Sequence, residues 1–145
     1  MSRGYFGIGI YHGKSAINIG TLWRSANIYG ASFIFTIGRR YKKQCSDTLK
    51  TWRHIPLYHY QTFKDFNDHR PHDSRLICIE NIEQALPLEL LSHPERCVYL
   101  LGAEDHGLPK HILWGEHCVK VASKECLNVA VAGSIVMYDR FVKGG

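Results

Sequence analysis

The sequence predicts an α/β domain built on a mostly parallel β-sheet flanked by helices. Short apolar segments alternate along the chain with amphipathic ones. Two of the apolar segments, residues 75–80 and 97–101, are continuous, as in parallel strands covered on both faces. The chain has 145 residues, the size of one domain, with 45% hydrophobic and 21% charged residues. This composition excludes a disordered, collagen-like or coiled-coil protein.

The N-terminal half is expected to contain three strands and one clear helix. Its short apolar runs predict strands at residues 6–11 and 32–37, and a weaker one at 57–60. Residues 18–29 carry apolar side chains at helical spacing, and Gly30 is a plausible end of that helix. Residues 61–67 are expected to form the beginning of a second helix.

The C-terminal half continues the alternation with strands at residues 75–80, 97–101 and 118–122. Residues 82–91 are helical in composition, and Pro87 either interrupts this helix or marks its first turn. Residues 127–142 form a final amphipathic helix. Its apolar side carries Val131, Ile135, Tyr138 and Val142. The sequence contains no internal repeat and no linker, so we expect a single domain over residues 1–145.

The positive charge of the chain is concentrated in one segment. Lysine and arginine number 18 against 13 aspartates and glutamates, a net charge of +5. Residues 39–53 contain six basic side chains and one acidic one: Arg39, Arg40, Lys42, Lys43, Lys50 and Arg53 against Asp47. Because the rest of the chain is neutral overall, this basic segment predicts a surface that binds a polyanion, with RNA or DNA as the first candidates. The alternative is a solvated loop.

Cysteine and histidine usage indicates a reduced, metal-free protein. None of the five cysteines forms a C-x-x-C pair, and Cys78, Cys97 and Cys118 lie in apolar runs, as small core residues of a cytoplasmic protein do. His69 and His72 lie in a turn-like segment without further ligands nearby, so we expect no zinc site. No apolar run approaches the roughly 18 residues of a membrane span. The first ten residues do not resemble a secretory signal.

Three polar, glycine-containing segments follow predicted strands or open helices: residues 18–27, 101–109 and 125–133. The carboxyl ends of parallel strands are where functional groups collect in such a sheet. Each segment also has a purely structural interpretation. Asn18 and Asn128 could cap helices, and Arg24 could form a structural ion pair. No Lys-Ser/Thr follows Gly107, which excludes a phosphate-binding loop of the nucleotide triphosphatase type.

The three segments read N-x-G-x-x-x-R-x-A, G-x-E-x-x-G-L and L-N-V-x-V-A, in this order, over residues 18–132. Together they resemble the three motifs of the SpoU/TrmH family, which belongs to the SPOUT class of RNA methyltransferases. The resemblance implies methyl transfer from S-adenosylmethionine to a ribose 2′-hydroxyl of tRNA or rRNA, with tRNA slightly favoured. It also implies a C-terminal deep trefoil knot that holds the cofactor, and a homodimer whose active site uses both subunits.

The resemblance assigns roles to individual residues. The catalytic residues that it implies are Arg24, Asn18, Glu104 and Asn128. The cofactor-binding residues that it implies are Ile79, Gly102, Val121, Cys126 and Leu127. Arginine is effectively always protonated, so anchoring a phosphate and stabilising a developing alkoxide suits Arg24 better than acting as a base. For RNA contact we expect Arg39, Arg40, Lys42 and Lys43 of the basic segment.

The sequence departs from the family pattern at Cys126, because motif three usually begins with serine. A thiol is a weaker hydrogen-bonding group than a hydroxyl. This departure supports a second hypothesis, an RNA-binding SPOUT homologue without catalytic activity. Binding of S-adenosylmethionine distinguishes the two, since the enzyme requires it and a bare RNA-binding module does not.

Overall fold

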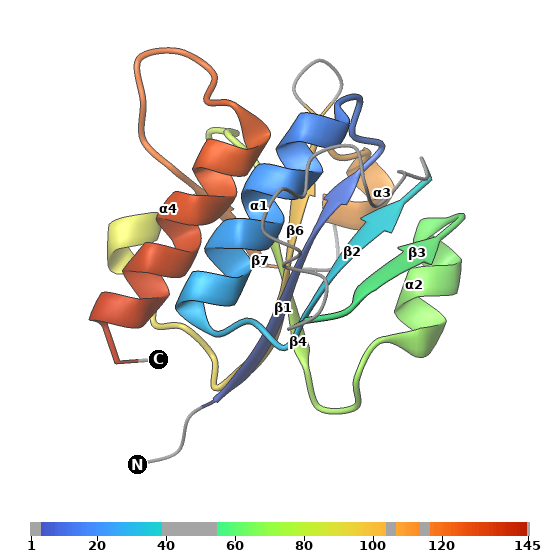
Figure 1. The fold of residues 1–145 in the computed structure, drawn as a ribbon. Coiled ribbons are helices and arrows are strands. Elements are labelled where there is room, and N and C mark those ends of the chain that lie inside the picture. The colour runs from blue at the N-terminus through green and yellow to red at the C-terminus, as the bar shows by residue number, and fades with distance from the viewer. Residues whose placement is uncertain (1–3, 39–54, 104–106, 114–116, 145) are drawn as a thin grey trace.

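A seven-stranded, entirely parallel sheet organises the chain in the computed structural model (Figure 1). The structure describes residues 4–38, 55–103, 107–113 and 117–144. The strand order is β3-β2-β1-β6-β4-β7-β5. The strands are β1 (Tyr5–Tyr11), β2 (Phe33–Ile37), β3 (Leu57–Tyr60), β4 (Arg75–Ile79), β5 (Leu86–Pro87), β6 (Arg96–Gly102) and β7 (His117–Lys120). The predicted fold class is therefore confirmed.

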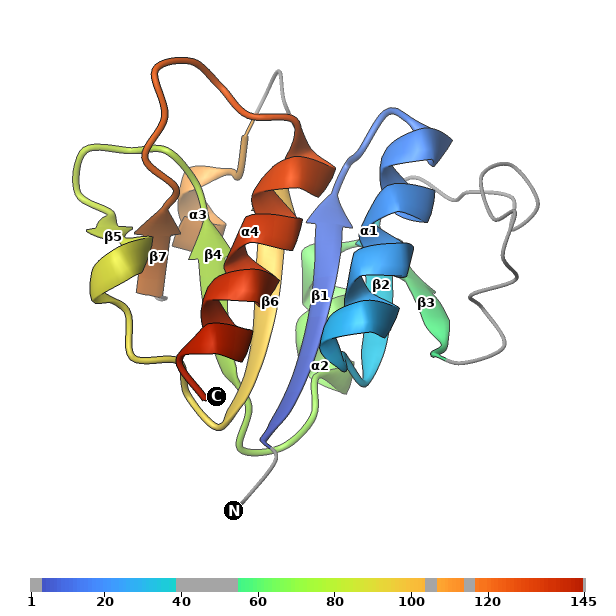
Figure 2. The same cartoon turned by 60° about the vertical axis from the view of Figure 1, so that its left-hand side comes forward.

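Helices cover both faces of the sheet. The two long helices, α1 (Ala16–Tyr29) and α4 (Val129–Val142), lie side by side on one face (Figure 2). The shorter α2 (Phe63–His69) and α3 (Lys110–Leu113) lie on the other. Each face has its own apolar core, one around Trp23 and Met137 and one around Phe35 and Phe66. Strands β1, β6 and β4 are buried between these layers, which explains their continuous apolar sequences.

Small residues let the two long helices approach closely. A Cβ on Gly133 of α4 would lie 2.5 Å from the Cδ1 atom of Leu22 on α1. One turn away, the hydroxyls of Ser25 and Ser134 form a hydrogen bond of 2.7 Å across the same contact. Helix α1 begins at Ser15, whose hydroxyl accepts from the backbone N–H of Ile17, and ends at Gly30 with φ +83°. Asn18 therefore does not cap this helix.

A buried polar network holds the C-terminal end of α4 to the segment before β6. Arg140 is buried and donates hydrogen bonds to the backbone carbonyls of Pro94 and Glu95, at 2.8 and 3.0 Å, and to the Tyr99 hydroxyl. Its guanidinium also lies 4.9 Å from the centre of the Phe6 ring. The buried guanidinium charge is thus stabilised by carbonyl oxygens and by the face of an aromatic ring.

The helix predicted at residues 82–91 is wrong. The chain instead forms strand β5, which pairs with β7, and the short 3-10 helix Leu88–Leu90. Pro87 has no N–H to donate and disfavours helical geometry at the residue before it, which explains the extended conformation there. The four-residue helix α3 was not anticipated, because one turn is too short to show a periodicity.

The apolar side of α4 faces away from the rest of the described protein. Val131, Ile135, Tyr138 and Val142 are exposed, whereas Ala130, Gly133, Val136, Met137 and Arg140 face the protein. The helix itself begins at Val129, close to the predicted start. No helix in the described part of the chain is long and apolar enough to cross a membrane.

Candidate active site

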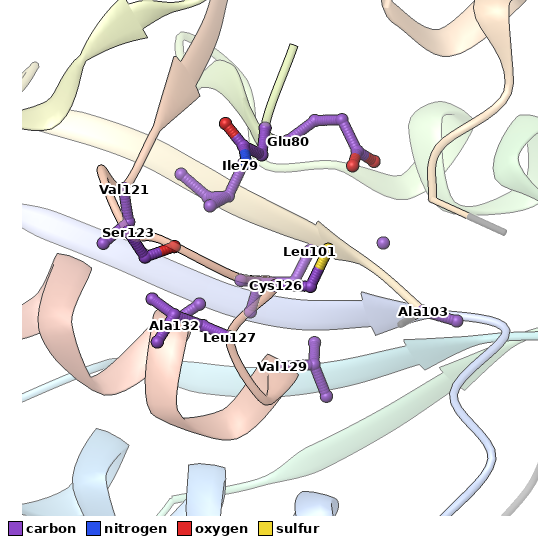
Figure 3. Close-up of a pocket in the computed structure, with 12 residues that line it drawn as sticks. Ile79, Glu80, Leu101, Ala103, Val121, Ser123, Cys126, Leu127, Val129 and Ala132 are labelled. Carbon is purple, nitrogen blue, oxygen red and sulfur yellow. The ribbon is translucent and has the colours of Figure 1, made fainter. Parts of the chain in front are cut away.

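A pocket lies at the carboxyl ends of β4 and β6, closed by the loop that leads into α4 (Figure 3). Its walls come from three separate stretches of chain that the parallel sheet brings to one edge. The lining residues are Ile79, Glu80, Asn81, Leu101, Gly102, Ala103, Val121, Ser123, Cys126, Leu127, Val129 and Ala132. All five residues expected to bind the cofactor are among them.

The pocket is mostly apolar, with backbone polar groups along its edges. Ile79, Leu101 and Val129 are buried core residues that expose part of their side chains to it. Val121 and Leu127 are half-buried and belong to the loop that follows β7. Such a lining suits a flat aromatic ring held between aliphatic side chains. Figure 3 shows Ile79, Val121 and Ala132 around the same space.

Glycine at position 102 is required by close packing. A Cβ there would lie 2.7 Å from the Gly107 carbonyl carbon, 2.8 Å from the Leu108 nitrogen and 2.9 Å from the Glu80 Oε2 atom. Gly107 itself adopts φ +63° and donates its N–H to the Ala103 carbonyl at 2.9 Å. The backbone of motif two thus folds back on itself at the pocket edge, and the space next to Gly102 is filled by main chain and by Glu80.

The asparagines of motifs one and three meet beside this pocket. The Asn128 side-chain N–H group donates to the Asn18 Oδ1 atom at 2.9 Å. The Asn128 Oδ1 atom accepts from the backbone N–H groups of Ala130 and Val131, so Asn128 also caps α4. The structural interpretation of Asn128 is therefore correct, and it coexists with the contact between the two motifs.

Arg24 lies further along α1, outside the lining of the pocket. It is half-buried and lies at helical spacing from Thr21 and from the exposed Ile17 and Ile28. The structure therefore groups Asn18, Asn128 and the five cofactor residues but places Arg24 on the adjacent helix surface. Glu104 and the four basic residues Arg39, Arg40, Lys42 and Lys43 lie outside the described residues.

Glu80, which directly follows β4, lines the pocket but is not part of the three sequence motifs. Its Oε2 atom accepts a hydrogen bond of 2.7 Å from the backbone N–H of Leu108. Its position at the carboxyl end of a buried strand was the available signal, the same one that identified Ile79. Glu80, Asn81, Ser123 and the remaining apolar lining residues were not predicted as site residues.

The cysteines divide into inert core thiols and one exposed thiol. Burial raises the pKa of Cys118 to about 11, with the nearby Glu80 charge adding to the effect. Burial likewise raises the pKa of Cys97. Cys78 is also buried, as expected of a small core residue, and Cys126 is exposed at the pocket. Only Cys126 of these four has both access and a place in the candidate site.

The sequence matches the family model of the SpoU rRNA Methylase family over residues 6–138. The chain belongs to this family. Its reaction is methylation of RNA, and S-adenosylmethionine is its cofactor. The pocket fits that cofactor, because its apolar lining suits the adenine ring and Gly102, which has no side chain, forms part of its wall.

Solved structures with the SpoU-family fold resemble this chain over almost its whole length. A structure that concerns 2-OH methylation of C/U34 on tRNA has a TM-score of 0.83 and 23% identity, with 99% of each chain covered. The TrmH/SpoU tRNA modifying enzyme of A. aeolicus has a TM-score of 0.82 and 14% identity, covering 99% of this chain and 78% of that one.

An AdoMet-bound rRNA methyltransferase from Sinorhizobium meliloti has a TM-score of 0.79 and 21% identity. The match covers 94% of this chain but only 56% of that one. Comparison with curated protein sequences gives no match.

Proposed function

We propose that this SpoU-family chain methylates the 2′-hydroxyl of a ribose in tRNA, with S-adenosylmethionine as the donor. The observation that carries the proposal is the single pocket that gathers Gly102, Val121, Leu127 and the other expected cofactor residues beside the Asn18–Asn128 pair. A tRNA substrate is supported by the likeness to the structure for C/U34 of tRNA, because that match spans 99% of both chains.

The bound cofactor supplies an electrophilic methyl group whose bond to sulfur breaks, with its electrons left on sulfur, as the ribose oxygen attacks. Arg24 would bind the phosphate next to the target ribose through its two parallel N–H groups and stabilise the negative charge that develops on the oxygen. The hydroxyl proton passes to a base or to water. Positioning of the hydroxyl supplies much of the acceleration in such a displacement.

The other assigned residues would support this geometry. Asn18 and Asn128 fix the start of α1 against the start of α4, next to the pocket. Glu104 would take part in catalysis from motif two. The basic residues Arg39, Arg40, Lys42 and Lys43 would neutralise RNA phosphates near the site.

The pocket also supports the expected knot. Its lining comes from residues 79–81, from residues 101–103 and from six positions between Val121 and Ala132. These are the stretches of chain that a C-terminal trefoil knot would hold together around the cofactor.

We also propose that the enzyme is a homodimer formed by the exposed faces of α1 and α4. Large apolar side chains recur along both helices, which lie side by side (Figure 2). They are Ile17 and Ile28 on α1, and Val131, Ile135, Tyr138, Phe141 and Val142 on α4. A group of exposed large apolar side chains on neighbouring helices is typical of a protein interface.

The position of Arg24 favours a second copy of this chain as the partner. Arg24 shares its helix surface with Ile17 and Ile28, so a partner on this surface would lie next to the catalytic arginine. An active site that uses both subunits requires such an arrangement. The apolar stripe and the catalytic residue thus point to one interface.

Sedimentation of a matched pair of variants tests the dimer. Tyr138 and Tyr58 are both about half exposed, at 54% and 47%, but Tyr58 lies on β3 and contacts Phe33 on the other side of the sheet. Tyr138→Lys should give a monomer with greatly reduced methylation, and Tyr58→Lys should leave the dimer intact. A wild-type monomer in solution, or a dimeric Tyr138→Lys protein, would contradict the proposed interface.

The reaction is tested with radiolabelled S-adenosylmethionine and separate pools of total tRNA and total rRNA. Label should enter the tRNA pool and remain on a 2′-O-methyl nucleoside after complete digestion. Label in rRNA alone would support the proposed methylation reaction and contradict the proposal that tRNA is the substrate. Absence of both label and cofactor binding would favour the non-catalytic RNA-binding homologue, for which the Cys126 departure is the supporting observation.

A further inference from the structure

Glu80 is the one charged side chain among the described residues that line the pocket. The other lining side chains are apolar, or are neutral as Asn81, Ser123 and Cys126 are. No lysine or arginine of the described chain lies within ion-pair distance of the Glu80 carboxylate, which is half-buried. Within the described part of the chain, the negative charge of Glu80 thus has no basic side chain as a partner, so a cationic group of a bound ligand would be a favourable neighbour.

The Glu80 backbone and side chain are both held in place. Its N–H donates to the Val119 carbonyl at 3.0 Å, and its own carbonyl accepts from the Ile82 N–H at 3.0 Å. The Oε2 atom accepts from the Leu108 N–H at 2.7 Å. Figure 3 shows the carboxylate extending from the end of β4 toward the end of β6. The hydrogen bond to Leu108 thus places the carboxylate at the pocket edge.

The methyl donor changes its charge during the reaction. The sulfur of S-adenosylmethionine is a cation before transfer and a neutral thioether afterwards, in S-adenosylhomocysteine. The amino-acid end carries an ammonium and a carboxylate in both molecules, and these offset each other. The sulfonium is thus the one positive charge of the donor without a counter-charge of its own, and the product lacks it.

We propose that the Glu80 carboxylate is the counter-charge for the sulfonium of the donor, so that the pocket binds S-adenosylmethionine in preference to S-adenosylhomocysteine. This inference rests on the proposed function. Loss of the positive charge on methyl transfer removes a favourable electrostatic interaction and so promotes release of the product. Glu80 is then a residue that determines cofactor selectivity, a role separate from its hydrogen bond to Leu108.

Calorimetric titration of Glu80→Gln with three ligands tests the proposal. Glutamine retains a side-chain oxygen that can accept the Leu108 N–H but has no charge. The ligands are S-adenosylmethionine, S-adenosylhomocysteine and sinefungin, which carries an amine near the position of the sulfonium. We expect the Kd to rise about tenfold for the two cationic ligands and to change less than twofold for S-adenosylhomocysteine.

Glu83→Gln is the matched control. Glu83 is an exposed acid three residues further along the chain and does not line the pocket. Its substitution removes the same charge and should leave all three Kd values unchanged. Thermal unfolding of both variants checks that the fold is intact.

Two results would overturn the inference. An equal rise in the Kd of all three ligands in Glu80→Gln would mean that the carboxylate binds a group common to them, such as the ribose hydroxyls. Unchanged Kd values would leave Glu80 only the role of anchoring Leu108. Wild-type protein that bound none of the ligands would instead overturn the proposed function, and this inference with it.

Discussion

Asn128 donates a hydrogen bond of 2.9 Å to Asn18, a residue 110 positions earlier in the chain. The bond joins motif one at the start of α1 to motif three at the start of α4. Both helices lie on the same face of the sheet (Figure 2), and the first turn of α4 contributes Val129 and Ala132 to the pocket (Figure 3). The contact therefore fixes two of the assigned catalytic residues relative to the cofactor pocket.

The two functions of Asn128 can be separated by substitution. Asn128→Ala removes both the cap of α4 and the donor to Asn18, and should lower the free energy of unfolding by about 1–2 kcal/mol. Asn128→Asp keeps an oxygen that caps the helix but has no N–H group, so stability should stay near the wild-type value while methylation falls. Urea unfolding and methyl transfer measure the two effects. A fully active Asn128→Asp enzyme would show that the bond to Asn18 is dispensable.

Arg24 is expected to act on the RNA and not on the cofactor, because it does not line the pocket. Arg24→Ala should reduce the rate of methylation by at least about a hundredfold while the Kd for S-adenosylmethionine stays within a few-fold. Arg24→Lys keeps the charge but loses the planar pair of donors, and should also be impaired. Single-turnover rates and calorimetry check both statements. Methylation that persists in Arg24→Ala would assign the residue a structural role.

The basic segment should dominate the salt dependence of RNA binding. Replacement of Arg39, Arg40, Lys42 and Lys43 by glutamine removes four positive charges. The slope of the logarithm of the binding constant against the logarithm of salt concentration should flatten by up to about one unit per lost phosphate contact. The Kd for S-adenosylmethionine serves as the control. A slope equal to that of the wild type would exclude these residues from the RNA interface.

The stability of the fold should fall in mildly acidic solution because of His93. Its side chain is 1% exposed and lies between the Tyr99 hydroxyl, 2.6 Å from Nδ1, and Asp139, 2.7 Å from Nε2. Arg140 donates to the Tyr99 oxygen, which leaves the Tyr99 proton for His93 Nδ1. In the neutral ring, Nδ1 can accept the Tyr99 proton while Nε2 donates to Asp139.

Burial lowers the pKa of His93 below its ordinary value, and the positive charges of Arg140 and Lys143 act in the same direction against the opposing effect of Asp139. Between this lowered pKa and about 6.5, the unfolded chain takes up a proton that the folded protein does not. The free energy of unfolding should therefore decrease as the pH falls through that window. His93→Gln should lower stability at pH 7.5 by about 1–3 kcal/mol and flatten the pH profile. Urea unfolding at several pH values would contradict this prediction if both proteins gave the same profile.

Local sequence signals predicted most of the sheet and the composition of the pocket. Continuous apolar runs identified β4 and β6, because strands buried on both faces contain few polar residues. The resemblance of the motifs to those of the SpoU/TrmH family indicated Gly102 and Leu127, which line the same pocket. Parallel topology explains this success, since residues that follow different strands meet at one edge of the sheet.

Tertiary packing decided the features that the sequence did not predict. The sequence identified a stripe of large apolar residues on one side of α4, but the opposite side is the buried one, where Gly133 lies against Leu22 of α1. Periodicity in the sequence shows that apolar residues share one face of a helix. It does not show whether that face packs against the sheet or is exposed. At Pro87 the helical composition of the segment was outweighed by the missing N–H and by pairing with β7. Glu80 was not predicted as a site residue, because acidic residues are common after strands. Only the tertiary structure shows that Glu80 lines the pocket and which described charges lie near it.

The backbone packing around Gly102 makes a sharp test of the pocket. In Gly102→Ala the new methyl group would lie within 3 Å of the Gly107 carbonyl carbon and the Leu108 nitrogen, both of which are main chain and cannot rotate away. The loop must shift, which should cost about 1–3 kcal/mol of stability and raise the Kd for S-adenosylmethionine at least about tenfold. Gly30→Ala is the control, because Gly30 has open space around it but a φ of +83°. It should cost about 1–2 kcal/mol through backbone strain and leave the Kd unchanged. Equal Kd values for the two variants would show that motif two does not form the cofactor site.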